Sequence, residues 1–247
     1  MTDAISNSSI DAAFHTTRWS VVSNARGDSP VAKEALSELC GLYYAPVVAF
    51  LAREGRSDDA AREIAHEFFR DLLAGANALS EIERSRGRFR SYLLGALKHF
   101  VANLRRAAVR EKRGGDIEHI AIASPTETSP GFDVADSASI PNDIVFDRAW
   151  ALAVVERALS QLQRECDADG RGDYFTELKP WLTPGGAMEA QTISATRLGM
   201  TEGALKVAIH RLRRRYREIV RTEIAQTLSE PGDLDAEMRH LVEALAA

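Results

Sequence analysis

Apolar side chains return at three- and four-residue steps along most of this chain, which is the period of one face of an α-helix. Four such stripes lie in residues 31–53, 59–73, 89–110 and 143–163. Their members are Leu36, Leu39, Tyr43, Val47 and Leu51; Ile64, Phe68 and Leu72; Phe89, Leu93, Leu97, Phe100 and Leu104; and Phe146, Trp150, Val154, Ala158 and Leu162. Aromatic residues, which favour strands, make up only 7% of the chain. The sequence therefore predicts an all-α protein.

Turn-forming residues mark the expected ends of these helices. Pro46 is predicted to open a second helix within residues 31–53, because proline suits the first helical position. The run Ser57-Asp58-Asp59 supplies an N-cap and acids for the positive end of the following helix. The Gly114-Gly115 pair is expected to end the third helix, and a shorter helix is expected from Tyr174 to Leu182.

Charge is distributed in blocks of opposite sign, although the whole chain has a net charge of only −5. Residues 84–113 hold ten Lys or Arg and one acid, a local net charge of +9. Residues 115–147 hold seven acids and no Lys or Arg, and residues 197–221 hold eight Lys or Arg and two acids. Two basic segments separated by an acidic one indicate two polyanion-binding surfaces. The alternative is that each basic run is a solvated helix face.

The acidic stretch also divides the chain into its expected domains. Residues 114–143 contain Pro, Ser, Thr and Asp without an apolar period, which is typical of a flexible linker. The sequence therefore predicts two small helical domains, at 14–113 and 144–221, joined by this acidic linker. Residues 222–247 are expected to form a C-terminal helical extension.

The segment TISATRLGMTEGALKVAIHRLRRRYREIV carries the most specific motif. A short helix ends at Gly199, Thr201 can cap the next helix, and a long helix follows, which is the helix-turn-helix pattern. Leu205, Ile209, Leu212, Tyr216 and Ile219 form one apolar face of the long helix. The residues expected to face DNA are Lys206, Val207, His210, Arg211, Arg213, Arg214 and Arg217.

Position along this helix separates two kinds of DNA contact. The first turns of a recognition helix lie deepest in the major groove, so Lys206, His210 and Arg211 are placed to reach base edges, and the later arginines to reach phosphate. His210 suits a base contact and a phosphate contact equally. An arginine-rich surface helix in a bundle remains the alternative for the whole segment.

A second basic segment, GRFRSYLLGALKHFVANLRRAAVREKR, has aromatic residues between its cations. Exposed rings beside positive charge are what unpaired nucleic-acid strands require, because rings stack on bases and cations follow the backbone. Phe89 lies on the apolar stripe and is expected in the core, whereas Tyr92 and His99 lie off it. The expected strand-binding residues are Arg88, Arg90, Tyr92, His99, Asn103, Arg105 and Arg106.

Motifs for other classes of protein are missing from the sequence. Cys40 and Cys166 are too few and too far apart for a zinc cluster or a disulfide framework, and are expected to be ordinary buried or half-buried thiols. The six histidines lack metal-ligand spacing, and no phosphate-binding loop or catalytic triad is present, so a hydrolase is a weak alternative. No catalytic residue, metal or cofactor is therefore expected. Neither a secretory signal nor a membrane span is visible, and a cytoplasmic location is expected.

The order of these motifs resembles an RNA polymerase sigma factor of the extracytoplasmic-function class. The resemblance covers nearly the whole chain from Phe14. It is carried by TTRWSVV, then EFFRDLL, then GRFRSYLLGALKHFVANLRR, then FDRAWALAVVERAL after the linker, then LGMTEGALKVAIHRLRRRY, and by REIVRTEIAQTL and MRHLVEAL at the end. The order and spacing are specific, although helix-turn-helix patterns are common individually.

The resemblance implies a non-enzymatic transcription initiation factor. The helix at 59–73 would dock on core RNA polymerase through Asp59, Glu63, His66 and Glu67. The helix at 88–106 would open the -10 element of promoter DNA and hold a flipped base, and the helix at 202–217 would read the -35 element as duplex. The implied partners are core polymerase and promoter DNA, with an anti-sigma factor left open, and the free protein is expected to be a monomer.

Three departures from the family pattern stand out. His66 and its neighbours replace the usual Gln-containing docking motif. His99 stands where many relatives have Asn for the flipped base. Ile193 and Ser194 stand where an acid and an aliphatic residue are expected in the helix before the turn. The competing interpretation is a helix-turn-helix regulator that does not dock on polymerase.

Overall fold

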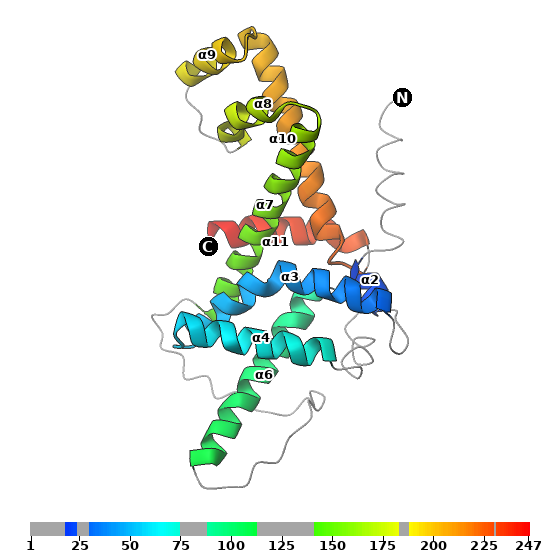
Figure 1. Cartoon of the computed structure of the whole chain (residues 1–247), viewed down its shortest axis with the longest axis vertical. Coiled ribbons are helices and arrows are strands. Elements are labelled where there is room, and N and C mark those ends of the chain that lie inside the picture. Colours follow the sequence, from blue (N-terminus) through cyan, green and yellow to red (C-terminus); the bar gives the residue numbers. More distant parts are fainter. Residues whose placement is uncertain (1–17, 24–29, 75–87, 113–140, 183–187, 230) are drawn as a thin grey trace. The chain divides into compact units, whose positions relative to one another are not determined.

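The structure is a computed structural model that describes residues 18–23, 30–74, 88–112, 141–182, 188–229 and 231–247. These residues form α2 (Arg18–Ser23), α3 (Pro30–Arg53), α4 (Asp58–Ala74), α6 (Phe89–Lys112), α7 (Asn142–Ala168), α8 (Gly172–Leu178), α9 (Met188–Arg197), α10 (Glu202–Ala225) and α11 (Leu234–Ala246), with 3-10 turns η2 (Lys179–Leu182) and η3 (Pro231–Asp233). Within these ranges there is no β-strand, and one isolated antiparallel bridge joins Arg88 to Leu228. The all-α prediction is confirmed for the described residues (Figure 1).

The chain divides into two compact units. Unit 1 comprises Met1–Ala151 and Ala225–Ala247, and unit 2 comprises Leu152–Ile224. This division differs from the expected boundaries, since the first turns of α7 and the whole C-terminal segment belong to unit 1. The cause is burial: Phe146 and Trp150 of α7 and Leu234 and Leu241 of α11 are all within the core. Of the expected linker, residues 114–140 lie outside the described residues. Its last residues are described, and α7 already begins at Asn142.

Aromatic side chains form the centre of unit 1. The ring centroid of Phe89 lies 4.9 Å from that of Trp19 and 5.0 Å from that of Tyr43, and Phe146 stacks on Tyr43 at 6.3 Å. Trp19, Tyr43, Phe89 and Phe146 are fully buried. Because these rings come from α2, α3, α6 and α7, they join segments that are distant in sequence, and aromatic pairs at such separations add stability beyond the area that they bury.

The predicted apolar stripes are the buried faces of the helices. Every stripe member is buried except Ile64 and Leu104, which are half-buried. α3 and α4 lie side by side (Figure 1). The Phe68 ring of α4 lies 5.4 Å from that of Phe100 in α6, and the Phe69 ring lies 6.1 Å from that of Tyr44 in α3. The helix at 59–73 is therefore confirmed as α4, and the helix at 89–110 as α6.

Pro46 does not begin a helix; that prediction is wrong. α3 runs without interruption from Pro30 to Arg53, with Pro46 inside it. A proline at this position removes the hydrogen bond that its N–H would donate to Leu42 and strains the preceding turn. Both Pro46 and Val47 are buried, so packing of the continuous apolar face offsets that cost.

The start of α4 follows the predicted capping pattern. The backbone N–H of Ala60 donates to Ser57 Oγ at 3.4 Å, and Asp58 and Asp59 occupy the first turn. Gly55, with φ of +80°, ends α3 in the left-handed conformation that glycine adopts at low cost. The short segment between the two helices is thereby fixed at both ends.

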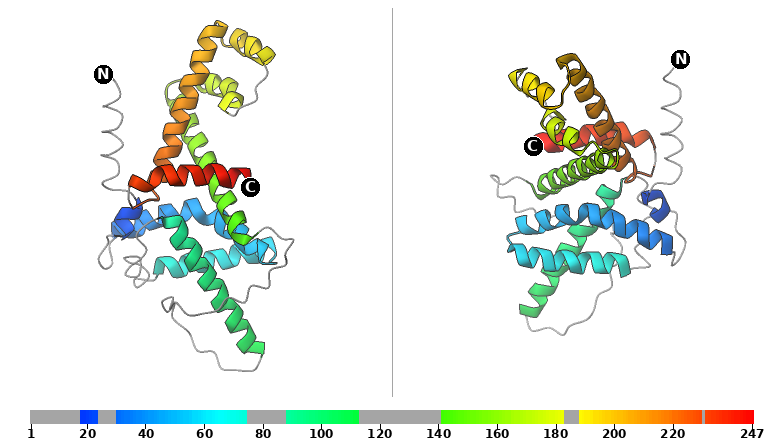
Figure 2. Two further views of the ribbon diagram at one scale, coloured as in Figure 1. Left: turned by 180° about the vertical axis from the view of Figure 1, so that it is seen from behind. Right: turned by 45° about the horizontal axis from the view of Figure 1, so that its top comes forward.

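The C-terminal segment is bonded into unit 1 through its backbone as well as its side chains. The N–H of Trp19 donates to the carbonyl of Gln226 at 3.1 Å, and the N–H of Phe89 donates to the carbonyl of Thr227 at 3.0 Å. Figure 2 shows α11 beside the first turns of α7, where the rings of Trp150 and His240 lie 5.9 Å apart. Residues expected as an extension are thus part of the fold.

Unit 2 is built on an antiparallel pair of helices, the later part of α7 and α10. Arg157 Nε lies 3.1 Å from Glu223 Oε2, and Arg215 Nε and Nη2 each donate to Glu165 at 2.8 Å. The predicted helix from Tyr174 to Leu182 is α8 followed by the 3-10 turn η2, and Trp181 in that turn is buried.

Candidate nucleic-acid interface

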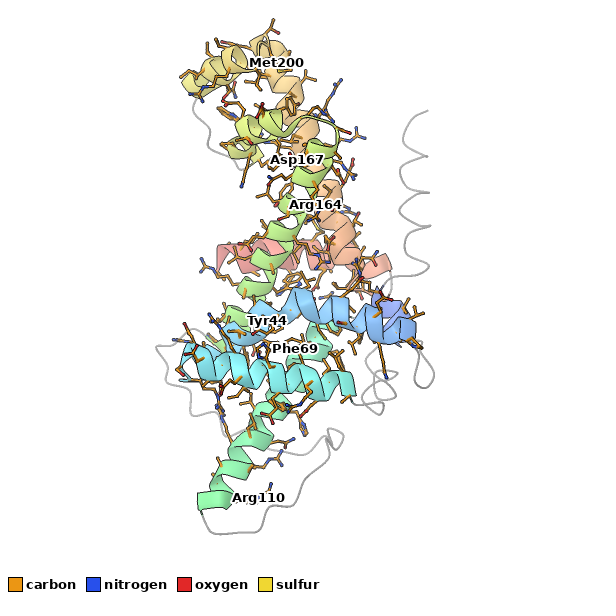
Figure 3. All side chains as sticks on the ribbon, in the orientation of Figure 1. Tyr44, Phe69, Arg110, Arg164, Asp167 and Met200 are labelled. Carbon is orange, nitrogen blue, oxygen red and sulfur yellow. The ribbon has the colours of Figure 1, made fainter. Side chains whose placement is uncertain are left out.

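A tight turn joins α9 to α10 in unit 2. Gly199 has φ of +61°, its N–H donates to the carbonyl of Thr196 at 3.1 Å, and the N–H of Met200 donates to that of Ala195 at 2.9 Å. This pair of hydrogen bonds is the Schellman ending that satisfies the last carbonyls of a helix. Figure 3 labels Met200 at the turn.

Thr201 caps α10 as predicted. Its Oγ1 accepts from the N–H of Ala204 at 3.2 Å, while its carbonyl accepts from the N–H of Leu205 at 2.9 Å. The first turn of α10 begins directly after the Gly199 turn, so the direction of α10 relative to α9 is fixed by a few local hydrogen bonds.

α10 has an apolar face and a cationic face. Leu205, Ile209, Leu212 and Ile219 are buried, and Tyr216 is half-buried with its hydroxyl donating to the carbonyl of Val155 at 3.2 Å. Six of the predicted DNA-facing residues are exposed on the opposite side: Lys206, Val207, His210, Arg211, Arg214 and Arg217. Val207 is 50% exposed, which leaves an apolar side chain among the cations.

Arg213 differs from the other six. It is half-buried, and its Nε donates to the carbonyl of Trp181 at 2.6 Å. A guanidinium held against a backbone carbonyl ties α10 to η2. Arg213 is therefore a structural residue of unit 2 in this conformation, in contrast to the prediction that it faces DNA.

The cations of α10 also differ in their ionic partners. Arg214 lies 3.0 Å from Glu218 on the same helix, and Arg215 is held by Glu165. Lys206, Arg211 and Arg217 form no ion pair with any other described residue. Their charge is therefore uncompensated by nearby carboxylates within the described part of the chain, as an anion-binding surface requires.

Two residues of α9, Ile193 and Ser194, differ from the pattern expected for the helix before the turn. Ser194 is buried, and its hydroxyl donates to Glu177 Oε1 at 2.7 Å. Arg197 lies 3.5 Å from the same carboxylate. Ile193 is 54% exposed, so it packs little where it stands. Glu177 of α8 thus replaces the apolar contact that an aliphatic residue at position 194 would make.

In unit 1, the structure separates the predicted strand-binding residues at the start of α6. Arg90 is 7% exposed; its Nε donates to Glu237 Oε1 at 2.8 Å and its Nη1 donates to Asp147 Oδ1 at 2.6 Å. Burial acts to lower the pKa of Arg90, but the bonds and charges of Glu237 and Asp147 outweigh it, so this pKa is raised and the guanidinium stays charged. The guanidinium carbon of Arg90, Cζ, also lies 5.3 Å from the centroid of the Trp150 ring. Arg90 is therefore buried in the core of unit 1, in contrast to the prediction that it faces solvent.

Arg88 and Tyr92 also contact other residues of unit 1. Arg88 Nη1 lies 3.0 Å from Glu237 Oε2, and Nη2 lies 3.6 Å from Asp233 Oδ1. Tyr92 is half-buried, with its ring 5.5 Å from that of Trp19 and 6.2 Å from that of Phe89. Neither side chain is as accessible as the sequence suggested.

The later part of α6 is open. Asn103 Nδ2 donates to His99 Nδ1 at 3.3 Å, and Arg106 Nη2 donates to Asn103 Oδ1 at 2.7 Å. Arg105 pairs with Glu54 in the turn after α3, yet 65% of its side chain is exposed. Figure 3 labels Arg110 near the far end of this helix. Hydrogen bonds thus join His99, Asn103 and Arg106 along one side of α6, whereas Arg105 turns toward Glu54.

The predicted docking residues share one side of α4. Asp59, Glu63 and His66 are exposed and Glu67 is half-buried. The His66 ring stacks on Tyr44 of α3 at 5.4 Å, with 2.9 Å between Nε2 and the Tyr44 hydroxyl. Figure 3 shows Tyr44 facing Phe69, so His66 covers the edge of the α3–α4 core.

Sequence reasoning missed the carboxylates that hold α6. Glu237 is fully buried on α11, in line with the buried Leu234, Leu241 and Ala244. An acid at an apolar position of a helix is a signal that a cation is buried opposite it. The sequence contains that signal, but it does not identify Arg90 as the partner.

The described residues contain no group of three or more His, Cys, Asp and Glu able to hold a metal ion. Cys40 and Cys166 are free and buried, as expected, and burial raises the pKa of the Cys40 thiol to about 12. Among the described helices, α3 alone is long and apolar enough to cross a membrane, but half of the relevant window is buried, as in the core helix of a globular unit.

Comparison of the chain with protein-family models, with curated proteins and with solved structures finds no match.

Proposed function

We propose that this protein is a transcription initiation factor similar to the extracytoplasmic-function sigma factors, directing core RNA polymerase to specific promoters. The observation that carries the proposal is the exposed cationic face of α10, which begins one short turn after α9. Lys206, His210 and Arg211 lie in its first turns, and Arg217 lies further along. A helix-turn-helix module would place these turns in the major groove of the -35 element.

The exposed surfaces of unit 1 support the remaining roles. Asp59, Glu63 and Glu67 offer carboxylates to a basic partner such as a polymerase clamp. His99, Asn103 and Arg106 offer hydrogen-bonding groups beside cations, which suits an unpaired strand of the -10 element. Core RNA polymerase and promoter DNA are the proposed partners, in the cytoplasm, with a monomeric free protein, no cofactor and no catalytic residue.

One observation favours the second candidate, a helix-turn-helix regulator that acts without polymerase. Arg88 and Arg90 are occupied by carboxylates of the same chain, so the start of α6 offers no charge to a separated strand in this conformation. Such a regulator would use α10 alone.

Co-purification with core RNA polymerase distinguishes the two candidates. The full chain is expected to be retained by core polymerase, and Glu63→Lys with Glu67→Lys is expected to abolish retention, because the two reversals place like charge at a basic partner. Glu243→Lys, on the exposed side of α11, is the matched control. Absence of retention of the natural sequence contradicts the sigma-factor proposal and leaves the regulator, whereas equal retention of all three proteins contradicts the docking role of Glu63 and Glu67.

A further inference from the structure

Cations of α6 and of the residue just before it are paired with carboxylates from four other segments of unit 1. Arg88 lies against Glu237 and Asp233, and Arg90 against Glu237 and Asp147. Further along, Lys98 Nζ lies 2.6 Å from Asp143 Oδ2, and Arg105 pairs with Glu54. Each carboxylate comes from α7, η3, α11 or the turn after α3, so this pairing is a property of the fold and not of α6 alone.

The pairing is tightest at the start of α6. The side chain of Glu237 is fully buried and that of Arg90 is 9% exposed, whereas those of Lys98 and Arg105 are more than half exposed. Exposed ion pairs exchange partners readily because water and salt screen them, but a buried pair is held. Glu237 of the C-terminal segment, together with Asp147 of α7, therefore closes Arg90, while Arg88 beside it is partly covered and the later cations are loosely covered.

Backbone hydrogen bonds hold the C-terminal segment in this place. Gln226 and Thr227 accept from the N–H groups of Trp19 and Phe89, and Leu228 forms a bridge with Arg88. His240 Nε2 lies 3.0 Å from the second oxygen of Asp147, which joins α11 to α7 on the other side of the cluster. The segment thus contacts both sides of the arginine pair.

A carboxylate offers a guanidinium the same chemistry as a phosphate group: two negatively charged oxygens that accept a pair of N–H donors. The N–H groups of an Arg side chain that face a carboxylate in this way cannot bind the backbone of a nucleic acid at the same time. We propose that the C-terminal segment Ala225–Ala247 competes with single-stranded DNA for Arg88 and Arg90, and keeps the start of α6 closed in the free protein.

The accessible residues further along α6 allow a DNA strand to bind in two stages. Arg106 and the His99–Asn103 pair are accessible with the segment in place, so a strand can bind there without displacing it. Movement of α11 away from α6 would remove Glu237 from Arg88 and Arg90, and so free charge at the start of the helix for a second contact. The inference rests on the proposed role of α6 as the strand-binding helix, but not on polymerase docking.

Removal of one negative charge tests this competition. We would measure binding of a fluorescent single-stranded DNA of about 30 nucleotides to the full chain carrying Glu237→Gln, which keeps an acceptor for Arg90. Glu243→Gln is the matched control, because it removes the same charge from an exposed position of the same helix. Glu237→Gln is expected to bind about 10-fold more tightly than the control, since each added phosphate contact releases counterions. Equal affinity of the two folded variants would overturn the proposal.

Hydrogen exchange of the natural sequence provides the second arm, and decides alone if Glu237→Gln does not fold. Saturating DNA is expected to accelerate exchange of α11 and of the Phe89 amide, which is bonded to Thr227. Unchanged protection of α11 with DNA bound would overturn the competition. Neither arm contains polymerase, so a failed transcription assay leaves this result standing, and a failure here leaves polymerase docking intact.

Discussion

Glu237 Oε1 accepts a hydrogen bond from Arg90 Nε at 2.8 Å, across 147 positions of sequence. Both side chains are nearly or fully buried, so this pair fixes the C-terminal helix against α6 inside unit 1. A buried pair with a second carboxylate, Asp147, leaves the arginine compensated on two sides. Loss of either partner would leave buried charge without compensation.

Glu237→Ala is therefore expected to lower the free energy of unfolding of unit 1 by about 3–5 kcal/mol. Denaturant unfolding followed by the fluorescence of the buried Trp19 and Trp150 measures it. Glu243→Ala, at an exposed position, is expected to change stability by less than about 0.5 kcal/mol. Equal effects of the two variants would show that the Glu237–Arg90 pair does not hold the C-terminal segment.

The proposed reading of base edges by α10 predicts that its cations differ in their effect on DNA binding. Lys206→Ala or Arg211→Ala is expected to weaken binding of a cognate -35 duplex by about 1–3 kcal/mol and to relax preference at one base pair. Arg215→Ala removes the same charge from a residue already held by Glu165, and is the control. A competition assay with random duplex DNA separates the cases, because a phosphate contact would lose affinity equally on both DNAs.

The Thr201 cap predicts a stability effect that is separate from DNA contact. Thr201→Ala is expected to lower the free energy of unfolding of unit 2 by about 1 kcal/mol, because the N–H of Ala204 loses its acceptor. Thr222→Ala, within the same helix, replaces a hydroxyl that bonds back to Glu218 and is expected to be neutral or slightly stabilising. Thermal unfolding followed by circular dichroism measures both variants, and a neutral Thr201→Ala contradicts the capping geometry.

The Glu165–Arg215 pair predicts acid sensitivity of unit 2. Hydrogen bonds from Arg215 lower the pKa of Glu165 below its ordinary value of 4.5 in the folded protein. Its contribution to stability is therefore fully present above pH 4.5 and is lost as the pH falls through the lowered folded pKa. Unfolding measured across this range should show a shallower acid dependence for Glu165→Gln than for the natural sequence, and identical slopes would contradict the pairing.

Much of the fold is predictable from local pattern. The apolar periods place α4, α6 and α7, and the Ser57 and Thr201 caps and the Gly199 turn lie where the sequence indicates. These features depend on residues only a few positions apart. Pro46 shows the limit, since its strain is offset by packing that the sequence does not reveal.

The candidate site is less predictable for the same reason. Exposure of Lys206 and Arg211 follows from helical register, whereas burial of Arg90 depends on Glu237 and Asp147, which are distant in sequence. Arg213 likewise depends on the carbonyl of Trp181. Charge pattern alone predicts where cations are, but the partners that occupy them are a property of the tertiary structure.

Transcription from a promoter library tests the central claim most directly. The full chain, added to core RNA polymerase, is expected to start RNA synthesis at templates that share one -35 and one -10 element, and Lys206→Ala with Arg211→Ala should remove the -35 preference. Failure of the natural sequence to start RNA synthesis at any template, with active core polymerase, would contradict the assignment as an initiation factor.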